Sequence, residues 1–120
     1  MKIEPFRKIV STVVYETKPL SGFDKRNPTK YRWENTNKLL GKMDGIIGTK
    51  TGITNAAGPC FAGYYELNNM KLALILCHSK TMDDRWQEIR NMVKWAEIEK
   101  AKSKQQCARE KARAQVVKQN

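Results

Sequence analysis

Apolar residues recur at helical spacing near the start of the chain. Their positions follow i, i+3, i+4 and i+7, and Pro5 suits a first helical turn, so the pattern predicts an amphipathic helix over residues 5–14. The apolar positions are Phe6, Ile9, Val10 and Val13. The end of this helix stays open, because Val13 to Tyr15 equally suit a strand.

Residues 16–35 lack periodicity and carry many charges, which predicts a loop. The residues that break the pattern are Pro19, Gly22 and the pair Asn27-Pro28. After this loop, Asn35 to Asn37 can cap a short helix that runs through Leu40 and ends at Gly41.

Short β-rich runs fill the centre of the chain. Residues 46–52 predict a strand punctuated by glycine, and residues 60–67 and 70–78 predict two strands joined by Asn68-Asn69. Asparagine tolerates the positive φ that a two-residue hairpin turn requires. Nearly every residue of the last strand is apolar, so we expect that strand to be covered on both faces.

The clearest helical pattern follows Thr81, whose hydroxyl can cap a helix with Asp83 and Asp84 in its first turn. One apolar stripe at helical spacing predicts a core-facing side. The stripe consists of Met82, Trp86, Ile89, Met92, Val93 and Ala96. Beyond Ala96 the stripe ends, while strong helix formers continue to about Val117.

These elements predict an α+β fold in two parts. Residues 1–96 would form a domain with a small antiparallel sheet of about three strands, packed by the last helix. Residues 97–120 would form a basic helical extension.

The composition excludes two broad classes of protein. Of the 120 residues, 40% are hydrophobic and 29% are charged, which is too apolar for a wholly disordered chain and too polar for a membrane protein. The longest apolar run, residues 72–77, is far shorter than the roughly 20 residues of a membrane span. The first residues lack the apolar core of a secretory signal, so we expect an intracellular protein.

The cysteines favour a reducing compartment, because Cys60, Cys77 and Cys107 show no Cys-x-x-Cys spacing. A four-ligand zinc site would need all three together with His78, the single histidine, and their spacing does not suggest one. We therefore expect neither a metal nor a cofactor.

Positive charge gathers at both ends of the chain. There are 23 Lys or Arg against 12 Asp or Glu, a formal charge of +11. Residues 1–45 contribute +5 and residues 97–120 contribute +4, whereas the residues between them contribute only +2. Basic ends favour an acidic partner such as RNA, an anionic membrane or tubulin, and a merely solvated surface is the alternative.

Several short motifs follow one another in a specific order. They are Asn35-Thr36-Asn37-Lys38-Leu39-Leu40, Met43-Asp44-Gly45-Ile46, Gly48-Thr49-Lys50-Thr51-Gly52-Ile53-Thr54 and Ala56-Ala57-Gly58. Together with the hairpin and helix after them, they resemble the D-alanyl-D-alanine carboxypeptidases, low-molecular-weight penicillin-binding proteins of the serine β-lactamase superfamily. The resemblance covers roughly residues 3–98 and corresponds to the C-terminal part of that family's catalytic domain, so it implies a partial fold of that type.

The resemblance also implies roles for four residues. In the family, Lys-Thr-Gly lies on an edge strand beside the active site, where Lys50 and Thr51 would help to hold the substrate carboxylate. Gly52 would let the backbone pass close to the substrate, and the N–H of Ile53 would be one of two oxyanion donors.

The attacking group of the family is missing from these residues. Its nucleophile lies in Ser-x-x-Lys, and a second motif is Ser-x-Asn. None of the serines fits either pattern; they are Ser11, Ser21, Ser79 and Ser103. No cysteine or threonine is set beside a base as a substitute. We therefore expect that the chain is not an enzyme but a pseudoenzyme.

The helical half of the family's fold is also missing, which would leave an apolar sheet face and a strand edge bare. We expect other protein subunits to cover this face and the helix over residues 97–120, and the chain to be stable only with such a partner.

Three functions are compatible with these features. The first is a non-catalytic structural subunit of a large intracellular assembly, with a ciliary doublet microtubule favoured and a mitochondrial complex as the alternative. The second is a fragment or split chain of a serine-type D-alanyl-D-alanine carboxypeptidase or β-lactamase-like hydrolase, whose nucleophile lies on another polypeptide. The third, a nucleic-acid-binding module, has enough positive charge, but aromatic residues are only 8% and no aromatic platform is evident.

Overall fold

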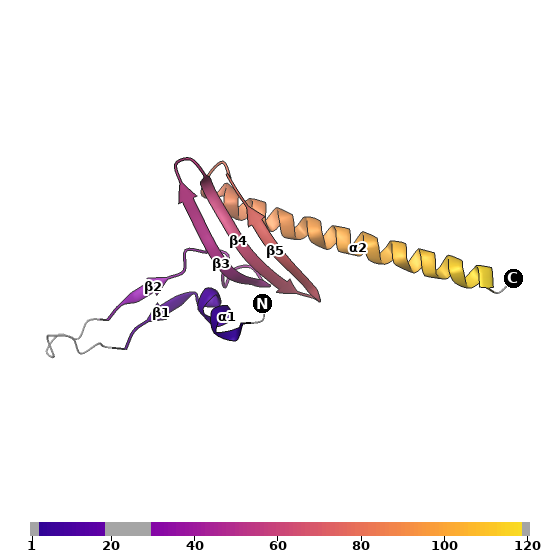
Figure 1. The fold of residues 1–120 in the computed structure, drawn as a ribbon, viewed down its shortest axis with the longest axis horizontal. Coiled ribbons are helices and arrows are strands. Elements are labelled where there is room, and N and C mark those ends of the chain that lie inside the picture. Colours follow the sequence, from indigo (N-terminus) through magenta and orange to yellow (C-terminus); the bar gives the residue numbers. More distant parts are fainter. Residues whose placement is uncertain (1–2, 19–29, 119–120) are drawn as a thin grey trace. The chain divides into compact units, whose positions relative to one another are not determined.

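The computed structural model describes residues 3–18 and 30–118 (Figure 1). The predicted α+β class is confirmed: the described residues form two small antiparallel sheets and a long C-terminal helix. Contacts within the chain define two compact units, residues 1–86 and 87–120. The predicted domain boundary at residue 96 stays a prediction. The elements are α1 (Glu4–Ser11), β1 (Val14–Glu16), β2 (Arg32–Glu34), β3 (Ile46–Thr54), β4 (Gly58–Leu67), β5 (Met70–Leu76) and α2 (Asp84–Lys118).

The first helix is shorter than predicted. Helix α1 has its proline in the first turn, as expected, but it ends at Ser11 because Thr12 is already extended. None of its residues is buried, so the apolar stripe on α1 does not form part of the core of this chain.

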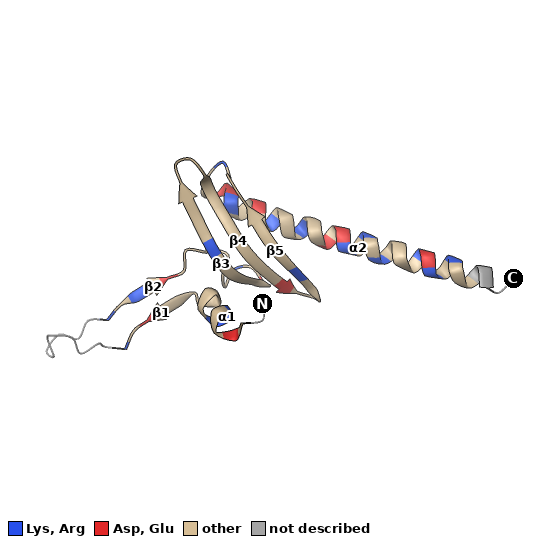
Figure 2. Cartoon of the chain, viewed as in Figure 1, with Lys and Arg blue, Asp and Glu red and all other residues tan. Residues whose placement is uncertain are grey.

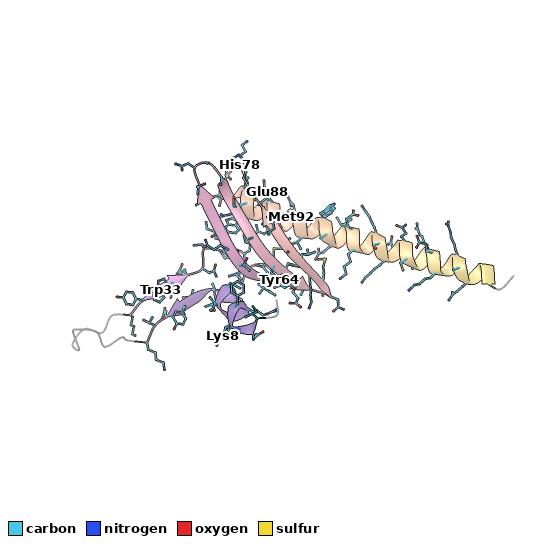
Figure 3. All side chains as sticks on the ribbon, viewed as in Figure 1. Lys8, Trp33, Tyr64, His78, Glu88 and Met92 are labelled. Atoms are coloured by element: carbon cyan, nitrogen blue, oxygen red, sulfur yellow. The ribbon has the colours of Figure 1, made fainter. Side chains whose placement is uncertain are left out.

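The loop predicted over residues 16–35 is wrong at Glu16 and at Arg32–Glu34, which lie in strands. Strands β1 and β2 pair in antiparallel fashion, with Tyr15 opposite Trp33. Trp33, labelled in Figure 3, stacks on both Tyr15 and Tyr31, with ring centroids 6.0 and 5.7 Å apart. A small aromatic platform is therefore present after all. The predicted turn residues at 19–29 lie outside the described residues. Strands of three residues are too short to show periodicity, and their pairing partners lie far apart in sequence.

The short helix predicted through Leu40 is instead a series of turns. Asn37 does cap them, because its Oδ1 accepts a hydrogen bond of 3.0 Å from the Leu39 N–H. Leu39 and Leu40 are both buried. Gly41, predicted to end the helix, lies within these turns with φ of +69°, a conformation that favours glycine.

The larger sheet has the strand order β3-β4-β5, and both neighbouring pairs are antiparallel. Asn68 and Asn69 form the predicted hairpin turn, with φ of 51° and 57°. The expectation that β5 is covered on both faces is wrong, since burial alternates along it and Ile75 is 64% exposed. A strand of an antiparallel sheet can bury one face only, so the residues on its other face stay exposed even where they are apolar.

The core of the first unit lies on the other face of this sheet. Phe61 and Tyr65 of β4 are each 2% exposed, and Leu74 of β5 lies beside them. The ring of Trp86 meets Phe61 edge to face, with centroids 6.1 Å apart. Gly63 leaves room for the Phe61 ring, because a Cβ there would lie 2.1 Å from the ring.

Helix α2 begins as predicted. The Thr81 hydroxyl accepts a hydrogen bond of 3.0 Å from the Asp84 N–H. Trp86, Ile89 and Val93 of the predicted stripe are buried, whereas Met82 precedes the helix and is 43% exposed. Residues 101–115 are exposed throughout, and Lys, Arg, Asp and Glu are distributed along the helix (Figure 2). Neither α2 nor any other described helix is long and apolar enough to span a membrane.

Candidate active site

The Lys-Thr-Gly motif lies on β3, at the edge of the three-stranded sheet. Lys50 is exposed and its Nζ contacts the Thr51 carbonyl oxygen. The Thr51 side chain is buried, whereas Gly52 and Ile53 are exposed. The structure therefore brings the four predicted site residues together along one accessible strand edge.

The upstream Asn-Thr-Asn motif fixes the position of Thr51. The hydroxyls of Thr36 and Thr51 share a hydrogen bond of 2.6 Å. Asn35, beside Thr36, donates from Nδ2 to the carbonyl oxygens of Val10 and Thr12, at 3.3 and 3.1 Å. Its Oδ1 accepts from the backbone of the next asparagine at 3.0 Å. The motif thus ties the end of α1 to β3, which explains why these residue types stand at this spacing.

A glycine lets α1 approach the same strand. Gly48 has φ of +119°, and a Cβ there would lie 2.4 Å from the Val10 carbonyl oxygen. Any side chain at this position would push α1 away from β3. The first half of β3, just before Lys50 and Thr51, therefore packs closely against the backbone of α1.

A hollow of about 590 Å³ lies along this strand edge. Among the described residues, its lining contains three cationic side chains, two hydroxyls and no carboxylate. The residues that line it are Thr36, Lys38, Lys50, Thr51, Gly52, Ile53, Met82 and Arg85. Cations and hydroxyl donors without a competing acid form a site for an anion, and a carboxylate matches both the charge and the donors.

Arg85 is a residue of this hollow that the sequence analysis missed. It is 2% exposed, and its Nη1 donates to the carbonyl oxygens of Cys60 and Gly52, at 3.1 and 3.4 Å. Its guanidinium carbon lies 4.2 Å from the centre of the Trp86 ring, and its buried Nε has no hydrogen-bond partner. Burial lowers the pKa of the guanidinium. The sequence did hold a signal for it: Arg85 is a charged residue directly beside the apolar stripe of α2, and that stripe is the side of the helix that faces the core.

None of the serines among the described residues lines this hollow. Ser11 and Ser103 are exposed and Ser79 is buried, and none of the three lines it. Ser21 lies outside the described residues. Within residues 3–18 and 30–118, no three His, Cys, Asp or Glu residues gather in a way that could hold a metal ion. The chemistry of the lining suits an anionic group.

Comparison with known proteins identifies the family. The model of the D-alanyl-D-alanine carboxypeptidase family matches residues 6–81, which is more than half of the chain. The chain belongs to the D-alanyl-D-alanine carboxypeptidase family. The resemblance noted from the motifs is confirmed. Among curated proteins, none matches the chain.

Solved structures show the same partial fold. A variant of the Streptomyces K15 DD-transpeptidase is similar with a TM-score of 0.69 and 25% identity, over 79% of this chain and 36% of that one. The unaltered enzyme has a TM-score of 0.67 and 24% identity, over 79% of this chain and 36% of that one. A further variant has a TM-score of 0.62 and 26% identity, over 76% of this chain and 36% of that one. The carboxypeptidase-like chain therefore spans about a third of the structures that it matches.

The expectation that the chain is not an enzyme is wrong. It rested on the absence of Ser-x-x-Lys and Ser-x-Asn from these residues. The family match instead places the chain among serine-type peptidases, and these residues correspond to only 36% of the related structures. The motifs are missing from one part of a carboxypeptidase fold, so their absence here is no ground for calling the chain a pseudoenzyme.

Proposed function

We propose that these residues form the substrate-binding part of a serine-type D-alanyl-D-alanine carboxypeptidase, whose nucleophile lies outside these 120 residues. The observation that carries the proposal is the hollow along β3. It unites the Lys-Thr-Gly motif with the Asn-Thr-Asn motif and a buried arginine, and its lining is cationic without an acid.

The chemistry of the substrate fits this lining. A peptide that ends in D-alanyl-D-alanine carries a terminal carboxylate, and the Lys50 ammonium and Thr51 hydroxyl are suited to bind it. Arg85 holds the carbonyl oxygens of Gly52 and Cys60 and adds positive charge from below the surface. Binding of the carboxylate at this end would set the scissile amide at a fixed position along β3.

The exposed backbone after the motif supports a second role. When a serine attacks the amide carbonyl, negative charge develops on its oxygen, and preorganised N–H donors stabilise that charge. Ile53 lines the hollow directly after Gly52, so its N–H is our candidate for one such donor. The leaving group would be the terminal D-alanine, and the acyl group would stay on the serine of the other part.

The outer face of the sheet supports a partner that carries the nucleophile. Lys50 of β3 and Ile75 of β5 are exposed on this face, and Ala62 of β4 is only half-buried. An apolar face with an adjacent open strand edge favours cover by another element. The partner segment belongs either to a longer form of this chain or to a separate polypeptide.

Other partners remain predictions from charge alone. The basic ends led us to expect an acidic surface such as tubulin or RNA, within a ciliary doublet microtubule or a mitochondrial complex. No feature of the described residues adds support for either host, and neither host belongs to the proposal.

Labelling with a fluorescent penicillin tests the proposal. Native material that contains this sequence would be captured through an affinity tag on the chain, labelled, and separated under denaturing conditions. We expect a covalently labelled polypeptide that is either a longer form of the chain or a partner captured with it, and an excess of unlabelled penicillin should prevent the labelling. Capture without any competable label would contradict the proposal.

A further inference from the structure

Two cysteines lie at the same end of strands β4 and β5: Cys60 is in β4, and Cys77 directly follows the last residue of β5. Their register runs from Leu67 opposite Met70 to Phe61 opposite Leu76. Extension of this register by one residue, past the end of β5 at Leu76, would place Cys60 opposite Cys77. Both cysteines are free thiols in the structure.

Pairing continues on the far side of the two cysteines. The Ser79 N–H donates a hydrogen bond of 3.0 Å to the Pro59 carbonyl oxygen. His78, which lies just past the end of β5 (Figure 3), has φ of +59°. Because the strands are held together before and after them, Cys60 and Cys77 occupy a defined cross-strand position.

The turn of the hairpin decides which kind of pair they form. A two-residue turn closes with a hydrogen bond between the residues that flank it, here Leu67 and Met70. Hydrogen-bonded and non-hydrogen-bonded pairs then alternate along the ladder, and Cys60 with Cys77 falls in the second class. In such pairs the Cα atoms are about 4.5 Å apart and the side chains approach each other. This distance lies within the roughly 4.4–6.8 Å range of disulfides.

Both thiols are accessible to small reagents. Cys77 is exposed and Cys60 is half-buried, and both line one shallow hollow of about 360 Å³ on the outer face of the sheet. The Cys60 thiol makes only weak contacts, to the carbonyl oxygens of Ala57 and Gly58 at 3.4 and 3.6 Å. A rotation about its χ1 bond would turn its sulfur toward the neighbouring strand.

We propose that Cys60 and Cys77 form a cross-strand disulfide when the chain meets a peroxide. One thiolate attacks the peroxide, breaks the O–O bond and becomes a sulfenic acid while hydroxide leaves and takes up a proton as water. The second thiol then attacks the sulfenic sulfur, the S–S bond forms, and a second molecule of water leaves. Two electrons pass from the two sulfurs to the peroxide, and a dithiol reverses the reaction.

The disulfide would lie beside the Lys-Thr-Gly motif. Gly52 of β3 is opposite Cys60, and a Cβ at Gly52 would lie 4.0 Å from the Cys60 Cβ. The bond would therefore complete a row across all three strands and fix the end of β5 next to the candidate site. The inference rests on the strand register and goes beyond the proposed carboxypeptidase function.

Peptide mapping of the peroxide-treated full chain tests the inference. Trypsin cuts after Lys50, Lys71 and Lys80, so Cys60 and Cys77 fall on the separate peptides 51–71 and 72–80. After treatment with hydrogen peroxide and digestion without reductant, we expect these peptides to be joined, with a loss of two hydrogens. A dithiol should release them, and oxidation in strong denaturant should yield at least several-fold less of the joined species.

Two variants separate this bond from other thiol chemistry. Cys107→Ser should leave the joined peptide unchanged, and Cys77→Ser should abolish it. Overoxidation of Cys60 and Cys77 as separate sulfinic acids would overturn the inference. So would disulfides that all involve Cys107 between two copies of the chain.

Discussion

Replacement of Arg85 by methionine tests whether this buried cation organises the candidate site. Methionine keeps the length and the apolar stem of the side chain but removes the guanidinium. The change removes the hydrogen bonds from Nη1 to the carbonyl oxygens of Cys60 and Gly52 and the charge that lies 4.2 Å from the Trp86 ring centre. Both strands β3 and β4 lose a link to the start of α2.

The size of the effect follows from three contributions. Hydrogen bonds from a charged donor contribute about 1.5–3 kcal/mol, and the contact of 3.4 Å to Gly52 is too long to count as a second full bond. The cation–π contact contributes about 1–2 kcal/mol at a desolvated position. Burial of the charge and of the unpartnered Nε opposes them by about 1–3 kcal/mol. We expect a net loss of roughly 2 kcal/mol in the free energy of unfolding.

Urea denaturation of the full chain measures this loss, and Arg85→Lys is the matched control. Lysine keeps the charge but not the planar guanidinium, which lies over the Trp86 ring and donates to both carbonyl oxygens from Nη1, so its effect should lie between wild type and Arg85→Met. The methionine variant should also bind a D-alanyl-D-alanine carboxylate at least several-fold more weakly. A methionine variant as stable as wild type, or more stable, would refute the reasoning, since the guanidinium would then make no net stabilising contribution to the free energy of unfolding.

Three further predictions follow from other contacts. Gly63→Ala should destabilise the chain by about 1–3 kcal/mol in thermal unfolding, because a Cβ would lie 2.1 Å from the Phe61 ring, and an unchanged melting temperature would show that the ring moves freely. A double-mutant cycle with Thr36→Val and Thr51→Val should give a coupling energy of about 1 kcal/mol in urea denaturation, whereas strictly additive losses would mean that the 2.6 Å hydrogen bond contributes nothing. The hydrogen bond from Arg7, followed by that from Lys71, lowers the pKa of Glu66 from 4.5 to about 2, so its stabilising effect should be complete above about pH 4.5 and lost as the pH falls toward 2. Glu66→Gln should flatten this part of the stability curve, and an unchanged curve would contradict the assignment.

Local signals in the sequence were sufficient for several elements of the fold. Asn68-Asn69 has a conformational reason to form a hairpin turn, and Thr81 has a side-chain oxygen that can cap a helix. Both depend on residues that are close together in sequence, and both are confirmed. The Lys-Thr-Gly motif was found on the strand edge where the family resemblance placed it.

Signals that depend on distant residues were missed. Trp33 lies in a strand only because Tyr15 pairs with it, and nothing in its own neighbourhood indicates this. In the sequence, Arg85 is one charged residue on an amphipathic helix. Its role depends on its hydrogen bonds to carbonyl oxygens of β3 and β4, which are distant in sequence. Ile75 was expected to be covered because it is apolar, yet its exposure depends on which elements lie over the sheet.

Binding of a small substrate analogue tests the central claim most directly. Amide signals of the isotopically labelled full chain would be followed by NMR as N-acetyl-D-alanyl-D-alanine is added, and then as its C-terminal amide is added. We expect the carboxylate to shift the signals of Thr51, Gly52 and Ile53, the amide to bind at least several-fold more weakly, and Lys50→Ala to abolish the response. Lys42→Ala, a change of an exposed lysine outside the hollow, should leave it intact. Equal responses to the carboxylate and the amide, or no shift at these three residues, would contradict the account.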